Sequence, residues 1–148
     1  MINMEIIFNK NIEEINKVEI EKYLKPFIWL IPNWCQKLVI NLYPMSDDYP
    51  QNALETTVYY DYRWIKINFY SGWLTERDEV KQEHIVHDLL HGFTSIVVDY
   101  ALEQIDNLCP ASEAEKFNRS MKAQLNILCE SMTQDLAFAI LNKFKNED

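Results

Sequence analysis

The first half of the chain carries hydrophobic patterns typical of short strands and one helix. Residues 4–8, 37–43, 56–60 and 64–70 are rich in β-branched, aromatic or alternating apolar residues, which predicts four strands. Residues 11–24 have apolar positions at a helical spacing and end before Pro26, which predicts a helix. Asp61, Tyr62 and Arg63 connect the last two strands and indicate a hairpin. In the second of these strands Ile65, Ile67 and Phe69 share one side, so one sheet face is expected to cover a core.

The second half changes to the period of helices after Thr75. One apolar side runs along a helix that extends to about Asn107: Val86, Leu89, Leu90, Phe93, Val97, Tyr100 and the polar Gln104. Pro110 ends this helix, and a second one runs to about Lys143. The second helix has one apolar stripe, made of Phe117, Met121, Leu125, Leu128, Met132, Leu136 and Ala139. The expected class is α+β: an N-terminal helix and a small, mainly antiparallel sheet, followed by two long helices, in one domain over residues 1–148.

Glycine is scarce in this chain of 148 residues, which contains only Gly72 and Gly92. Average usage would give roughly ten. A dinucleotide fingerprint or a phosphate-binding loop needs several glycines in one turn, so both are excluded. Gly72 falls at a natural turn between the hairpin and the next helix. Gly92 lies inside that helix at a cost of about 1 kcal/mol relative to alanine, which predicts close packing of a neighbouring element.

The charge balance narrows the choice of partners. Fourteen basic residues against 23 acidic ones give a net charge of −9, which disfavours binding to nucleic acid or to an anionic membrane surface. Hydrophobic runs are too short for a membrane span, and the N-terminus does not resemble a signal peptide. Cys35, Cys109 and Cys129 are widely spaced and odd in number, which indicates reduced thiols. We therefore expect a cytoplasmic protein.

All three histidines lie in one stretch of ten residues inside the first long helix. His87 and His91 are four positions apart, so they project from one side and have the spacing that lets two imidazoles bind one zinc ion. In the zinc motif H-E-x-x-H the residue after the first ligand is a glutamate that acts as general base. Asp88 occupies that position here, so the motif reads H-D-x-x-H.

The segment His87-Asp88-Leu89-Leu90-His91 resembles the zinc-binding helix of zincin metallopeptidases. The layout is similar to the minimal, gluzincin-type domains encoded by phages and prophages. The resemblance implies zinc held by His87, His91 and the later carboxylate Glu130, with Asp88 as general base for hydrolysis of a peptide or protein. It also implies that an edge strand aligns an extended substrate.

The helical wheel offers separate support for Glu130 as the third ligand. Glu130 lies off the apolar stripe but shares its side with apolar neighbours, where a carboxylate is costly unless it is paired or bound to metal. Asp135 is the weaker alternative for this role.

Two alternatives remain open from the sequence. Aspartate is one methylene shorter than glutamate, and a displacement of about 1 Å can cost on the order of a hundredfold in rate. The second hypothesis is therefore an inactive protein-interaction module on a zincin scaffold, with or without a structural metal.

His84 lies on the same face as His87 and His91. It is a candidate fourth ligand, a substrate-binding residue, or a solvated histidine near the helix start.

Overall fold

The computed structural model describes residues 4–45 and 54–146, which form four strands, three α-helices and three short 3-10 segments. The strands are β1 (Glu5–Phe8), β2 (Lys37–Tyr43), β3 (Leu54–Tyr59) and β4 (Trp64–Tyr70). The helices are α1 (Glu14–Leu24), α2 (Asp78–Leu108) and α3 (Ala111–Asn146), and the 3-10 segments are η1 (Lys25–Leu30), η2 (Tyr60–Tyr62) and η3 (Ser71–Thr75). The predicted α+β class and the order of its elements are confirmed.

The sheet is mixed, with strand order β1-β2-β4-β3. β1 pairs with β2 and β2 with β4 in parallel, whereas only β3 and β4 form an antiparallel pair. The expectation of a mainly antiparallel sheet is therefore wrong. The hydrophobic pattern reveals individual strands and the local hairpin, but it does not report pairing between distant strands. β4 lies between β2 and β3, and its core-facing residues Ile65, Ile67 and Phe69 are fully buried there.

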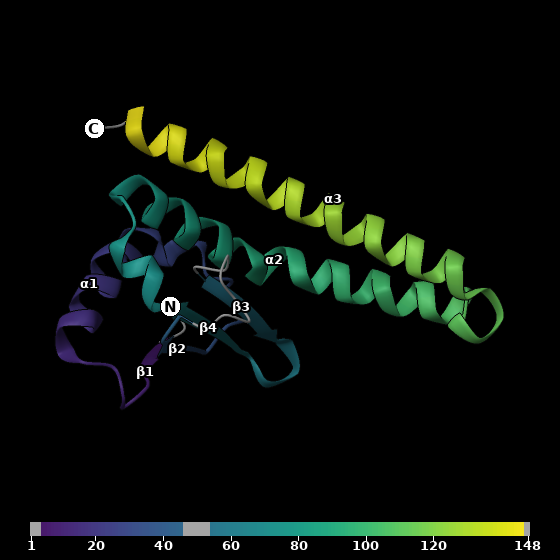
Figure 1. Ribbon diagram of the computed structural model, residues 1–148, viewed down its shortest axis with the longest axis horizontal. Helices are drawn as coiled ribbons and strands as arrows, with labels where there is room; N and C mark the ends of the chain where they lie inside the picture. Colours follow the sequence, from purple (N-terminus) through teal and green to yellow (C-terminus); the bar gives the residue numbers. More distant parts are fainter. Residues whose placement is uncertain (1–3, 46–53, 147–148) are drawn as a thin grey trace.

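One face of the sheet carries the core, as the alternation in β4 predicts. Leu38 and Ile40 of β2 lie beside the buried residues of β4, and the core also includes residues of α1, η1 and α2. Trp73 of η3 is fully buried and makes an edge contact with Phe69 at 4.8 Å between ring centroids. β3 is left at an edge of the sheet, with α2 packed against it (Figure 1).

α2 and α3 form an antiparallel hairpin whose closed end projects beyond the sheet (Figure 1). α3 packs along α2, and the buried residues of α3 include Cys129, Thr133, Ala137 and Leu141. The apolar stripe anticipated on this helix is instead largely in solvent: Leu128 is 66% exposed and Phe117 is 56% exposed. Small side chains at the contact allow the two helices to approach closely, and this places the bulky stripe outside the interface.

The cysteines and the helices agree with two further expectations. Cys35, Cys109 and Cys129 are all free thiols. Within residues 4–45 and 54–146, none of the helices has the length and apolar character needed to cross a membrane.

Gly92 lies in close contact with neighbouring elements, as its place inside the helix predicts. A Cβ atom there would lie 2.9 Å from Cδ of Pro32 and 3.1 Å from Cδ1 of Ile65. Neither the proline ring nor the fully buried isoleucine can move freely. We expect Gly92→Ala to destabilise the protein by about 1–3 kcal/mol, because overpacking outweighs the gain in helix propensity. Thermal and urea unfolding of the variant measure this loss.

Gly72 provides the matched control, since it is the only other glycine. A Cβ there would meet Sδ of Met45 at 2.5 Å, but Met45 is a flexible, half-exposed side chain that can turn away. Gly72→Ala should change the free energy of unfolding by no more than about 0.5 kcal/mol. Equal effects of the two substitutions would contradict the packing role of Gly92.

Candidate metal centre

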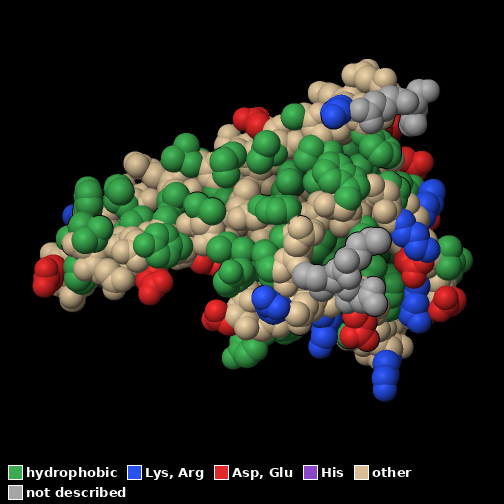
Figure 2. Space-filling view, turned by 180° about the vertical axis from the view of Figure 1, so that it is seen from behind, with side chains coloured by type: hydrophobic (Ala, Val, Ile, Leu, Met, Phe, Trp, Pro, Cys, Tyr) green, Lys and Arg blue, Asp and Glu red, His purple; other side chains and the backbone are tan. Residues whose placement is uncertain are grey.

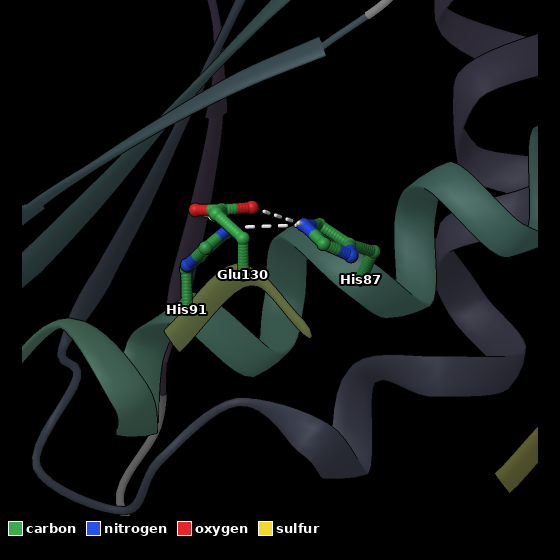
Figure 3. A group of neighbouring side chains, drawn as sticks. All are labelled: His87, His91 and Glu130. Atoms are coloured by element: carbon green, nitrogen blue, oxygen red, sulfur yellow. Dashed lines mark hydrogen bonds and ion pairs between the residues drawn. The ribbon is translucent and has the colours of Figure 1, made fainter. Parts of the chain in front are cut away.

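α2 presents His87 and His91 on one side, one turn apart. Their Nε2 atoms are 3.1 Å apart, and their rings lie nearly perpendicular with centroids 4.9 Å apart. Both side chains are mostly buried, with 18% and 15% of their surface exposed. The helical spacing therefore brings the two Nε2 atoms together, as the sequence predicts (Figure 3).

Glu130 of α3 reaches the same point from the facing helix. Its Oε2 lies 3.2 Å from Nε2 of His87, and its Oε1 lies 3.6 Å from Nε2 of His91 (Figure 3). Polar contacts about one turn further along α3 fix the register of the two helices. The Thr133 hydroxyl lies 3.2 Å from that of Thr94, and Gln134 donates to Glu83 at 2.7 Å. These contacts hold Glu130 opposite the two histidines.

The three side chains form a group that could hold a metal ion, and zinc provides a reference geometry. Ligand bonds of about 2.0–2.1 Å at tetrahedral angles place neighbouring donor atoms about 3.3 Å apart. The two Nε2 atoms are 3.1 Å apart, and the two carboxylate oxygens of Glu130 lie at 3.2 Å from one of them and 3.6 Å from the other. Donor atoms of His87, His91 and Glu130 all lie within 4.8 Å of one another, and together they form a group able to hold a metal ion. Two imidazoles and one carboxylate are the donor set of many catalytic zinc sites, in which the fourth position is left for water.

His91 is supported as a ligand by its surroundings. Its Nδ1 lies 3.4 Å from the hydroxyl of Thr94, which is buried between the long helices. A proton on Nδ1 that points to Thr94 leaves the lone pair of Nε2 directed at Glu130 and His87. Burial lowers the pKa of His91, so the neutral form that binds metal is favoured.

Asp88 follows His87 in sequence but points toward the sheet. Its carboxylate is buried and accepts a hydrogen bond from the Thr56 hydroxyl of β3 at 2.8 Å. Burial raises the pKa of Asp88 to about 6, although the bond from Thr56 acts in the opposite direction. This pKa is close to the value at which a carboxyl group transfers protons most efficiently near neutral pH.

A hollow of about 540 Å³ opens above these side chains. Its walls come from β3, α2 and α3, and include Thr56, Asp88, Asn126 and the three residues of the metal-binding group. The edge strand β3 therefore lies beside the group, where an extended ligand would have access to both.

The structure separates the remaining candidates from the group. His84 lines the same hollow but does not belong to the cluster of donor atoms. Burial lowers its pKa, and within the described part of the chain its buried Nδ1 has no hydrogen-bond partner. Asp135 is exposed and also lies outside the cluster. Among the described residues, three possible donor side chains thus converge and no fourth histidine, cysteine or carboxylate joins them.

Two residues of the site were not predicted from the sequence. Thr56 lies 32 positions before Asp88, and nothing in a strand pattern indicates that its hydroxyl meets a helix residue. Thr94 follows His91 by three positions, a helical spacing that would have identified it as a neighbour of the imidazole.

Comparison with known proteins gives no assignment. No protein-family model, curated protein or solved structure matches this chain. The functional argument therefore depends on the geometry of the site.

Proposed function

We propose that this protein is a zinc-dependent hydrolase that cleaves peptide bonds, on a scaffold like that of the zincins. The observation that carries the proposal is the convergence of His87, His91 and Glu130, whose donor atoms, one from each residue, all lie within 4.8 Å of one another. The open hollow above the group gives a substrate access to the remaining coordination position.

The chain would supply three functions to this chemistry. A zinc ion held by His87, His91 and Glu130 would lower the pKa of water toward about 7 and polarise the scissile carbonyl. Asp88, at the wall of the hollow, would accept a proton from the attacking water and return it to the leaving amine. Thr56 would hold the Asp88 carboxylate in place through its hydrogen bond.

The edge of β3 would position the substrate. β3 pairs with β4 on one side and, within the described residues, has no strand on its other side. Leu54, Glu55 and Thr56 of this strand line the hollow. An extended peptide that adds to this edge would pass the metal-binding group with its backbone hydrogen-bonded.

A second candidate is a metal-binding interaction protein without turnover. The observation that favours it is the position of Asp88, which is buried and hydrogen-bonded to the sheet. A carboxylate held back in this way can stabilise the helix that carries the histidines without reaching the water that would attack a substrate.

Zinc titration with a hydrolysis assay tests both candidates. Metal-stripped protein should take up one zinc ion per chain, and the zinc-loaded protein should cleave a labelled, unfolded protein such as casein. A chelator should abolish this cleavage and added zinc should restore it. His91→Ala should lose both properties, because it removes one of three ligands.

His84→Ala is the matched control, since it removes a neighbouring histidine of α2 that is not in the cluster. It should retain zinc binding. Failure of the wild-type protein to take up zinc would overturn the proposal. Stoichiometric zinc without cleavage of any substrate would favour the second candidate.

A further inference from the structure

A second hollow, of about 480 Å³, adjoins the hollow above the metal-binding group, and we call it the distal hollow. Asp99 of α2 lines both hollows, so it marks their junction. One wall of the distal hollow is formed by residues 58–62 of β3 and η2, and the other by α2 from Ile96 to Glu103. Residues 54–56 of β3 line the hollow above the metal-binding group. The same strand and the same helix therefore pass both hollows in turn.

The distal hollow has aromatic and acidic walls. Tyr60 and Tyr62 from η2 and Tyr100 from α2 line it, and their side chains are 53–78% exposed. Asp61 contributes a carboxylate from the hairpin side and Glu103 contributes one from the helix side. Within residues 4–45 and 54–146, neither carboxylate forms a hydrogen bond or an ion pair. Two carboxylates on different walls are thus free to bind a cation.

Basic side chains do not offset this charge. Among the described residues that line the two hollows there is no lysine or arginine. Lys66 contacts the Tyr59 hydroxyl at 3.3 Å, but it does not line the distal hollow. On the face seen from behind, most lysine and arginine side chains lie away from the projecting end of the helical hairpin (Figure 2). A cavity with acidic walls in a chain of net charge −9 attracts cations.

The spacing of the two hollows suits an extended peptide. Glu103 follows His91 by 12 positions in α2, which is about 18 Å along the helix axis. An extended peptide advances about 3.3 Å per residue. Roughly five residues therefore separate a peptide bond at the metal-binding group from a side chain in the distal hollow.

We propose that the distal hollow binds a lysine or arginine side chain of the peptide substrate, about five residues from the bond that is cleaved. This inference rests on the proposed function, since the peptide is taken to lie along β3 past the metal-binding group. The cationic group would lie between the carboxylates of Asp61 and Glu103. The rings of Tyr62 and Tyr100 would contact the alkyl part of the side chain and its charge. The protein would thus select basic peptides.

Binding and cleavage of defined peptides by the full chain test the proposal separately. Uncharged peptides with a central Ala–Leu bond carry lysine, glutamine or phenylalanine about five residues from that bond, in one set before it and in another after it. In one set the lysine peptide should bind metal-free protein about tenfold more tightly than the glutamine peptide. This preference should weaken as salt is added. The zinc-loaded protein should show the same preference in kcat/KM with little change in kcat.

Glu103→Gln should reduce the lysine preference to about threefold or less, and adding Asp61→Asn should remove it. Glu79→Gln is the matched control, because it neutralises an exposed carboxylate of the same helix that lines neither hollow. It should retain the tenfold preference of wild type. Circular dichroism should show unchanged folding in all variants, since the substituted residues are exposed.

Several outcomes would overturn the proposal. Equal binding of the lysine and glutamine peptides in both sets would show that the distal hollow does not select a cation. Tightest binding of the phenylalanine peptide would show that the tyrosines bind an apolar side chain instead. An equal loss of preference in Glu79→Gln and Glu103→Gln would assign the preference to overall charge. A lysine preference in binding without any cleavage would support this inference and count against the proposed hydrolase alone.

Discussion

The Asp88→Asn variant is expected to be more stable than wild type at neutral pH, by on the order of 2–3 kcal/mol in the metal-free protein. Asp88 is buried, and its pKa is raised from 3.8 to about 6. At pH 7 the folded protein therefore holds a carboxylate in surroundings that disfavour its charge. Asparagine has almost the same shape and can still accept the hydrogen bond from Thr56, so the variant removes this cost and retains the contact.

The expected pH dependence follows from the direction of this shift. Below about pH 4, Asp88 is neutral in both the folded and the unfolded protein, and the substitution should have little effect. Between about pH 4 and pH 6 the unfolded chain loses its proton while the folded protein retains it, so the stability of wild type falls relative to the variant. Above pH 6 the difference should be constant.

Urea unfolding in the presence of a chelator, at pH 4.5 and pH 7.5, measures this effect. The difference in midpoint between Asp88→Asn and wild type should be several-fold larger at the higher pH. Asp99→Asn removes an exposed carboxylate from the same helix and the same hollow, and should leave stability nearly unchanged at both values. A variant that is less stable than wild type at pH 7.5 would show that the charge of Asp88 is stabilising.

The cluster of His87, His91 and Glu130 was predicted more accurately than the sheet, because the relation between its two histidines is local. Four positions along a helix bring His87 and His91 together in any fold that keeps the helix. Helical spacing could not place Glu130. It lies 43 residues from His87, and the two side chains meet only because α2 and α3 pack in one register. That prediction depended on the resemblance and on the unusual place of a carboxylate among apolar neighbours.

The apolar stripe of α3 shows where the hydrophobic pattern was ambiguous. Periodicity identifies the bulky side of a helix, but it does not say what covers that side. α3 packs against α2 with Thr133 and Ala137, whereas Leu128 and Met132 are exposed. The bulky stripe is therefore left in solvent, although its periodicity is that of a core face.

Asp88 also illustrates a limit of a motif. The motif places a carboxylate beside the first histidine, but the direction of the side chain depends on the sheet beneath α2. Thr56 of β3 binds the carboxylate, and burial raises its pKa. Neither effect can be derived from five residues, because both require the contact between α2 and β3.

If the zinc-loaded protein cleaves peptides, Asp88→Asn should lower kcat by a factor of about 10²–10⁴, the usual contribution of a general base. Zinc affinity should change little, because Asp88 is not in the cluster of donor atoms. Asp88→Glu should raise kcat about tenfold or more, since one additional methylene carries the carboxylate from the wall near Thr56 toward the open hollow. Steady-state cleavage of a fluorogenic peptide, with zinc content measured for each sample, provides both values.

Asp99→Asn serves as the control for losing one negative charge from the hollow, and it should retain wild-type kcat. The combination of outcomes separates the two roles of Asp88. If Asp88 is both buried and the general base, Asp88→Asn should be more stable and less active than wild type. The same desolvation raises the pKa of Asp88 to about 6, which suits a group that accepts a proton near neutral pH. Greater stability with unchanged turnover would assign Asp88 to the scaffold alone and leave water activation to the ligands of the metal.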